Sequence, residues 1–171
     1  MRVEARIARN AELLGRLDAG TLDLAVVWGA GAGRQREVIT ELPMTWIGSQ
    51  AQPVMWTAGG AQPVPLVLFD SPCPFHSMAT ERLEAQGLGW HMAFTSSSLP
   101  GLAAATQAGL GYTVRTRLGL QPGTRIVDER AVGLPTLPSI ALSLCYQQAE
   151  RSPVVERLAG IVAQAIGMEL S

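Results

Sequence analysis

One pattern limits the folds open to this chain: an amphipathic segment, then a glycine, then a short apolar run. Its first copy reads NAELLGRLDAGTLDLAVVWG. Asn10 is a residue type that caps helices, leucines follow at helical spacing, and Gly20 is a typical helix terminator. The apolar run from 22 to 28 then has the length and composition of a buried strand. The segment therefore predicts a helix, a tight turn and a strand.

The second copy reads SSSLPGLAAATQAGLGYTV. Here Ser97 or Ser98 is the expected cap, Gly109 is the expected stop, and residues 112–114 are expected to be extended. Repeated helix–glycine–strand units indicate parallel strands joined by crossover helices, as in an α/β protein.

A third unit lies between these two copies. PLVLFDSP is a predicted strand ending at Asp70, residues 77–86 are a predicted helix with Gly87 as its stop, and residues 90–95 are the next predicted strand. The middle of the chain thus reads β-α-β-α-β.

Further elements flank this central run. Residues 44–48 are expected to form a strand, and the proline- and glycine-rich residues 49–63 a surface connection. IALSLCYQ is another predicted strand. SPVVERLAGIVAQAIG predicts an amphipathic helix that Ser152 caps and Gly167 ends.

Composition excludes several classes of protein. Of the 171 residues, 47% are hydrophobic and 16% charged, which is enough to bury a core. A net charge of −1 argues against a chain that binds nucleic acid through a basic surface. No apolar run has the length of a signal peptide or a membrane span, so we expect a cytoplasmic location. Cys73 and Cys145 are then expected to stay reduced.

The order of these segments carries a family likeness. AELLGRLDAGTLDLAVV, then PLVLFDSPCPF, then HMAFTSSSLPGLAAATQAGLGYTV, then a C-terminal amphipathic helix resembles the effector-binding domain of LysR-type transcriptional regulators. The resemblance covers essentially the whole chain. It implies an α/β fold of the type 2 periplasmic-binding-protein class, with two lobes joined by two crossover strands.

The resemblance also implies a division of the chain and a function. Lobe I would be residues 1–48 with 145–171, and lobe II residues 49–144. A small-molecule effector would bind between the lobes and change DNA binding by a winged helix-turn-helix domain. The family dimerises, so a homo-oligomer, as a dimer or larger assembly, is expected.

Compared with the family, this sequence is expected to start within lobe I. The winged helix-turn-helix and linker helix are not in it, and Val3 to Ile7 looks like the family's second strand. The first strand and helix of the lobe would then be missing, together with part of one wall of the effector cleft.

The serine-rich segment before the predicted helix at 99 is a candidate anion site. A helix N-terminus offers unpaired N–H groups and a partial positive charge, and ligands of α/β sheets bind beyond the carboxyl ends of strands. The expected contacts are Thr95, Ser96, Ser97 and Ser98. Simple helix capping, which needs one serine, is the alternative.

The same rule adds further candidate effector contacts at other strand ends: Trp28, Gly29, Asp70, Ser71, Pro72, Cys73, Thr113 and Arg115. Trp28 could offer an aromatic face, or it could simply be half-buried core. Arg115 could pair with an acidic effector, or it could be a solvated surface residue. A small carboxylate or another anion is the expected ligand class.

Other functions have weaker support in the sequence. Cys73 and His76 could form a thiol nucleophile pair, but no third group orients them, so we expect no enzyme. A zinc site from Cys73, His76, His91 and Cys145 lacks a second closely spaced pair, and no metal or cofactor is expected. The GAGAG of 29–33 does not open a helix, as a dinucleotide fingerprint must. A solute-binding protein of the same fold would need a secretory signal or lipid anchor.

Overall fold

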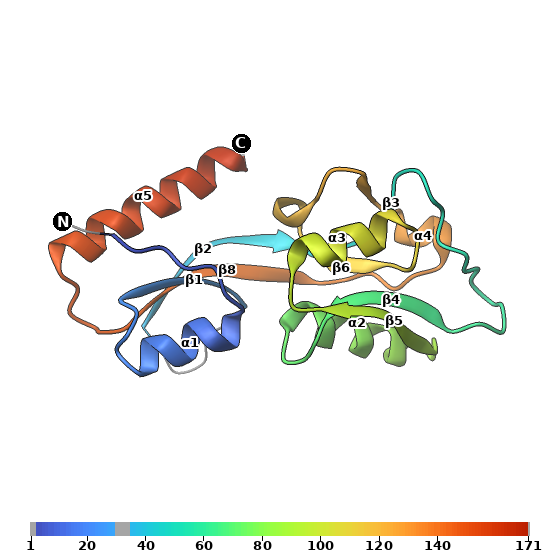
Figure 1. Ribbon diagram of the computed structural model, residues 1–171, viewed down its shortest axis with the longest axis horizontal. Helices are drawn as coiled ribbons and strands as arrows, with labels where there is room; N and C mark the ends of the chain where they lie inside the picture. Colours follow the sequence, from blue (N-terminus) through green and yellow to red (C-terminus); the bar gives the residue numbers. More distant parts are fainter. Residues whose placement is uncertain (1–2, 30–34, 171) are drawn as a thin grey trace. The chain divides into compact units, whose positions relative to one another are not determined.

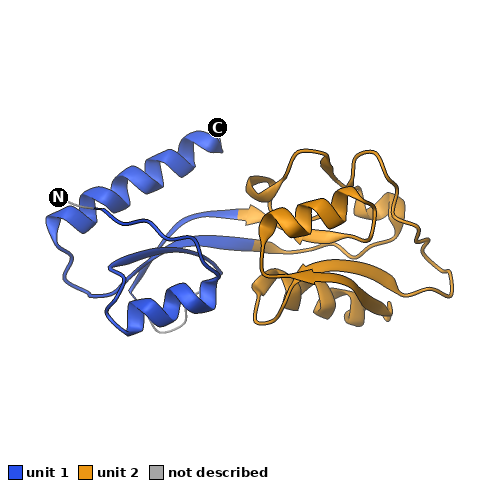
Figure 2. Ribbon diagram, in the orientation of Figure 1, with its two compact units in different colours: residues 1–41, 140–171 blue, residues 42–139 orange. Residues whose placement is uncertain are grey.

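The computed structural model describes residues 3–29 and 35–170. They form two compact units, residues 1–41 with 140–171 (unit 1) and residues 42–139 (unit 2), coloured separately in Figure 2. The chain passes from unit 1 to unit 2 within β2 (Arg36–Pro43) and returns at the start of β8 (Ser139–Tyr146).

Unit 1 is a three-stranded sheet between two helices (Figure 1). The strand order is β1 (Leu24–Trp28), β8, β2, and β1 runs antiparallel to β8 with Leu24 opposite Tyr146. Leu13 and Leu17 of α1 (Asn10–Asp18) pack with Ala25, Val27 and Cys145. Alternate residues of the strands, including Leu144 and Tyr146, instead contact Ala159 of α5 (Pro153–Glu169). Because successive side chains of a strand point to opposite faces of the sheet, α1 packs on one face and α5 on the other.

Unit 2 contains the predicted β-α-β-α-β run. β4 (Val64–Phe69) and β5 (Trp90–Ser96) are parallel and are joined through α2 (Pro74–Ala85). α3 (Leu99–Gln107) then leads to β6 (Thr113–Arg115). Figure 1 shows α3 and α2 on opposite sides of these strands. Leu102 and Ala105 of α3 pack on Val67 of β4.

A close backbone approach sets β6 beside β4. Tyr112 donates its backbone N–H to Pro65 O and accepts from Val67 N, each at 2.9 Å, in a parallel bridge. A Cβ on Gly111 would lie 2.5 Å from Pro65 O, so only glycine fits there. The second glycine of AGLG thus serves strand packing, whereas Gly109, with a φ of +74°, ends α3.

The other side of β6 pairs with β3 (Thr45–Ser49), which also pairs antiparallel with β7 (Thr124–Ile126). A 3₁₀ turn (η1, Arg117–Gly119) and the short helix α4 (Glu129–Val132) complete unit 2. The indole of Trp46, fully buried on β3, donates to Pro135 O at 2.7 Å. In the described chain, no helix has both the length and the apolar character that crossing a membrane requires.

Several sequence predictions are corrected. The strand expected at Val3 to Ile7 does not form, because no described residue pairs with the backbone of residues 3–9. Val3 and Ile7 are both exposed. β1 pairs antiparallel with β8, whereas parallel pairing holds for β4, β5 and β6. α2 begins at Pro74, three residues before the predicted Ser77, because proline suits the first helical position.

The predicted helix ends differ at two further places. Arg9 is the N-cap of α1, and the Asn10 side chain is used elsewhere. α5 continues through Gly167 to Glu169, since a glycine in a helix costs only about 1 kcal/mol when no turn requires its left-handed conformation. Four residues of the GAGAG segment, 30–33, lie outside the described residues; Gly29 is the exception.

Candidate functional site

The candidate site of unit 2 lies where parallel strands end. β4 and β5 run parallel, and the bridge between Leu66 and Tyr112 gives β6 the same direction. Their carboxyl ends therefore share one edge of the sheet, where ligands of α/β proteins bind. The predicted contacts at this edge come from three segments: 70–73 after β4, 95–98 at the end of β5, and 113–115 in β6.

The loop after β4 leads directly into α2. Its Ser71–Pro72 peptide bond is cis, and Cys73 is the N-cap of α2, with a half-buried free thiol. His76, in the first turn of α2, has Nδ1 2.7 Å from Phe69 O. Because a carbonyl only accepts hydrogen bonds, Nδ1 carries the proton and is engaged with the backbone. This histidine thus binds the end of β4.

The serine-rich segment combines capping with free hydroxyl groups. Ser98 is the N-cap of α3, and its Oγ accepts from Gly101 N at 3.4 Å. Ser96 Oγ accepts from Ser98 N at 3.1 Å. Within the described chain, the exposed hydroxyls of Thr95 and Ser97 have no hydrogen-bond partner. Half of the four predicted contacts therefore have a structural role already, and half are available to a ligand.

Arg115 lies at the centre of a cluster that sequence reasoning missed. Its guanidinium carbon is 4.4 Å from the ring centroid of Phe75 and 5.2 Å from that of Phe69. Burial lowers the pKa of Arg115, and the neighbouring Cys73 partly offsets that effect. Arg115 is therefore mostly desolvated, contrary to the alternative of a solvated surface arginine. The sequence signal for this cluster was the presence of an aromatic residue on each side of the 70–73 loop, Phe69 and Phe75.

The polar atoms of this cluster are incompletely paired. Among the described residues, Arg115 Nε and the hydroxyls of Thr113 and Thr116 are buried and lack hydrogen-bond partners. Thr113 and Arg115 are two residues apart on β6, so their side chains share one face of the strand. Natural proteins rarely leave such groups unpaired.

Trp28 and Gly29 belong to unit 1. The side chain of Asn10 holds the backbone of Trp28 through two hydrogen bonds, from Nδ2 to Trp28 O and from Trp28 N to Oδ1. Gly29 adopts a φ of +83° and donates to Ala141 O at 2.7 Å. The end of β1 is thus fixed by its neighbours.

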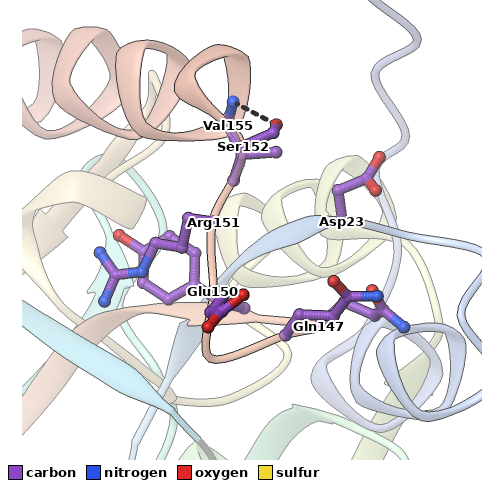
Figure 3. A pocket seen from close by; sticks show the side chains of 8 residues that line it. Asp23, Gln147, Glu150, Arg151, Ser152 and Val155 are labelled. Atoms are coloured by element: carbon purple, nitrogen blue, oxygen red, sulfur yellow. Dashed lines mark hydrogen bonds between the residues drawn. The ribbon is translucent and has the colours of Figure 1, made fainter.

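Unit 1 also contains a polar cavity of about 120 Å³, shown in Figure 3. Its lining residues are Asp23, Tyr146, Gln147, Gln148, Glu150, Arg151, Ser152 and Val155. The Arg151 guanidinium lies 3.7 Å from the Tyr146 ring centroid and 3.6 Å from Glu37 Oε2, and the Tyr146 hydroxyl donates to the same carboxylate at 3.1 Å. The arginine of this cavity therefore already has a carboxylate partner.

A metal site in the described residues would require several ligand side chains close together. In the described ranges, no three His, Cys, Asp or Glu side chains gather in a way that could hold a metal ion. His91 is exposed on β5, and Cys145 is fully buried in the core of unit 1.

Comparison with known proteins assigns the family. The sequence model of the LysR substrate binding domain matches residues 1–167. The chain belongs to this family. The LysR likeness predicted from the order of segments is thus confirmed, and the chain is an effector-binding domain of a LysR-type regulator.

Related LysR proteins are longer than this chain. The HTH-type transcriptional regulator PecT of Dickeya dadantii is 32% identical over 146 residues, which cover 84% of this chain and 44% of PecT. DgdR of Burkholderia cepacia, also an HTH-type transcriptional regulator, is 27% identical over 169 residues, 97% of this chain and 55% of DgdR. The chain spans about half the length of these curated relatives.

Solved LysR structures share the fold. The bromide-bound regulatory domain of HypT from Salmonella typhimurium superimposes with a TM-score of 0.68 at 16% identity, covering 92% of this chain and 80% of that one. The predicted α/β fold of the type 2 periplasmic-binding-protein class is therefore confirmed.

Proposed function

We propose that this domain binds a small anionic effector and thereby changes DNA binding by a helix-turn-helix domain of the complete regulator. The observation that carries the proposal is the shared edge at which β4, β5 and β6 end in unit 2. That edge combines hydroxyl groups, a helix N-terminus and the Arg115 guanidinium, all of which favour an anion. The bromide ion in the HypT domain supports the same ligand class.

The proposed effector contacts are those named from the sequence. Thr95, Ser97 and Arg115 offer hydrogen-bond donors, while Ser96 and Ser98 orient the turn that presents them. The loop of residues 70–73 borders the same edge. Trp28 and Gly29 of unit 1 stay proposed contacts by analogy with the family. We also propose the family's division of the chain, with lobe I as residues 1–48 with 145–171 and lobe II as residues 49–144.

Sensing requires that the effector distinguish two states of the regulator. A ligand that binds both conformations equally well transmits nothing, whereas one that prefers a single conformation shifts the population towards it. We propose that the complete protein works as a homo-oligomer in the cytoplasm, where DNA is accessible, and that this domain does not catalyse a reaction.

The proposal can be tested by thermal unfolding of the domain in the presence of organic acids, sugars, amines and inorganic anions. A ligand that binds only the folded state raises the melting temperature. Replacing both Thr95 and Ser97, as Thr95→Val with Ser97→Ala, should weaken the response. A domain that responds to neutral or cationic ligands and to no anion would contradict the proposed ligand class.

Two alternative functions have distinct signatures. A solute-binding protein would show the same ligand response but would not change DNA binding by the complete chain. An enzyme with a Cys73 nucleophile would react rapidly with a thiol reagent at neutral pH and would lose turnover in Cys73→Ser. Slow labelling of Cys73 by the thiol reagent would argue against this second alternative.

A further inference from the structure

Among the described residues, two arginines lie against aromatic rings, and they differ in one respect. Arg151 lies over Tyr146 and has the Glu37 carboxylate within 3.6 Å. Arg115 lies over Phe75 and Phe69, and no carboxylate of the described residues forms an ion pair with it. The cluster around Arg151 therefore includes a carboxylate partner, whereas the cluster around Arg115 lacks one among the described residues.

The missing partner has to reach Arg115 from a defined direction. The N–H groups of a guanidinium point outward in its own plane, whereas the aromatic rings interact with its faces. Nε is one of these in-plane donors, and it is buried without an acceptor. Thr113 lies on the same face of β6 and is only 6% exposed as a residue, and its buried hydroxyl also lacks a partner among the described residues. Two unsatisfied buried groups thus lie on one strand face.

Aromatic contact alone does not account for keeping a charge in this position. Burial opposes the charged form of Arg115, and an unpaired buried charge is among the more expensive features of a folded protein. A cation–π contact recovers only part of that cost. An external anion that accepts from the guanidinium would recover much more, because charge-assisted bidentate hydrogen bonds are strong where water is excluded.

We propose that Arg115 is the group that recognises the effector, and that the effector is an organic carboxylate whose hydrocarbon part contacts the aromatic side chain of Phe69. The planar fork of an arginine matches the two oxygens of a carboxylate, and Thr113 supplies a further hydroxyl donor. Phe69 is half-buried at the end of β4, so its ring offers apolar surface at the same place. This inference rests on the proposed function and names its ligand class and its selecting residue.

The first test needs no ligand. Arg115→Met removes the charge but keeps apolar contact with both phenylalanines, so the melting temperature should stay the same or rise. Arg125→Met is the matched control, since Arg125 is an exposed arginine on β7 of the same unit. A structural arginine would behave in the opposite way, and a fall in melting temperature of more than about 3 °C in Arg115→Met alone would overturn the proposal.

The second test uses sodium benzoate and sodium propionate as probes, with benzamide and propionamide as neutral counterparts at equal ionic strength. At ten times its Kd, a carboxylate should raise the melting temperature of the unaltered domain by about 3–6 °C. The rise should be lost in Arg115→Met, strongly reduced in Arg115→Lys, and kept in Arg125→Met. The lysine variant keeps the charge but loses the planar fork, so it separates recognition from simple attraction.

In the second test, the inference is overturned by an equal rise in Arg115→Met, by an equal rise with the neutral amides, or by a larger rise with inorganic phosphate than with either carboxylate. The first result would leave a ligand sensor that does not rely on Arg115, and the second a sensor that does not rely on the charge of the ligand. An unaltered domain that ignores both carboxylates but responds to another anion would also refute the carboxylate class, while the proposed function would stand.

Discussion

The side chain of Asn10 forms two hydrogen bonds with the backbone of Trp28, one to its carbonyl oxygen and one from its N–H. Asn10 is the first residue of α1, and Trp28 is the last residue of β1. The pair therefore joins the start of the helix to the end of the strand and fixes the backbone that leads into Gly29. A residue type that usually caps helices here satisfies a strand end.

We expect Asn10→Ala to destabilise the domain by about 1–3 kcal/mol, because it removes both hydrogen bonds of the Asn10 side chain to the partly buried backbone of Trp28. Urea unfolding followed by tryptophan fluorescence measures this loss. Glu12→Ala is the control on the same helix, since it removes only the exposed Glu12–Arg16 ion pair and should cost less than about 1 kcal/mol. Equal effects of the two substitutions would show that the Asn10 hydrogen bonds contribute little.

Two glycines should respond to alanine in opposite ways. A Cβ at Gly111 would lie 2.5 Å from Pro65 O and 2.8 Å from Pro65 C, so Gly111→Ala forces β6 away from β4 and should cost more than about 2 kcal/mol. At Gly160, in α5, a Cβ would meet nothing within 4 Å. Gly160→Ala should therefore stabilise the domain by about 0.5–1 kcal/mol through helix propensity alone. Thermal unfolding of both variants checks the pair, and a stable Gly111→Ala protein would refute the close approach.

The sequence predicts the elements whose signals are local. Ser98 and Gly109 bound α3 as expected, and Ser152 caps α5 as expected. A cap or a left-handed glycine acts within a few residues, so its effect can be recognised from the letters alone. The expected strand at Val3 to Ile7 failed because a strand exists only when another strand pairs with it, and no local signal reports that partner.

The candidate site shows the same distinction. Its strand-end position follows from the β-α-β-α-β order, so the sequence predicts the segments at 70–73 and 95–98 and the residues Thr113 and Arg115. The contact of Arg115 with Phe69 and Phe75 was missed, because these residues lie on three different elements, β6, β4 and α2. Both phenylalanines are forty or more positions away from Arg115 in the sequence. Burial of a charged side chain depends on that packing and on no pattern near Arg115 itself.

The serine-rich segment predicts a contrast between neighbours. Ser98→Ala removes the side-chain cap of α3 and should cost about 0.5–2 kcal/mol, whereas Ser97→Ala should change stability by less than about 0.5 kcal/mol, because the Ser97 hydroxyl has no partner among the described residues. Chemical denaturation of the two single variants measures the difference. A destabilising Ser97→Ala would mean that Ser97, and not Ser98, is the cap in solution.

Both tyrosines should make the domain sensitive to alkaline pH. Burial is the main cause that raises the pKa of Tyr146, the Glu37 carboxylate raises it further through a hydrogen bond and through charge repulsion, and the Arg151 charge opposes the shift. Burial also raises the pKa of Tyr112, but the Arg125 charge opposes the shift. In both cases the folded pKa lies above the unfolded value of about 10, so the folded state favours the neutral phenol. That contribution is fully present below pH 10 and is lost as the pH rises through the folded pKa, with a slope of at most about 1.4 kcal/mol per pH unit for each group.

Tyr146→Phe and Tyr112→Phe should therefore each flatten the loss of stability above pH 10. Both variants keep the same two cysteines and all thirteen arginines, so other titrations in this range are shared. Urea midpoints measured at intervals from pH 8 to pH 11 give the two slopes. At neutral pH, where the phenol is protonated, the loss of the hydrogen bond to Glu37 lowers the stability of Tyr146→Phe. A slope in Tyr146→Phe equal to that of the unaltered domain would show that the folded state does not favour the neutral phenol of Tyr146, and would contradict the effect of burial and of Glu37 on that group.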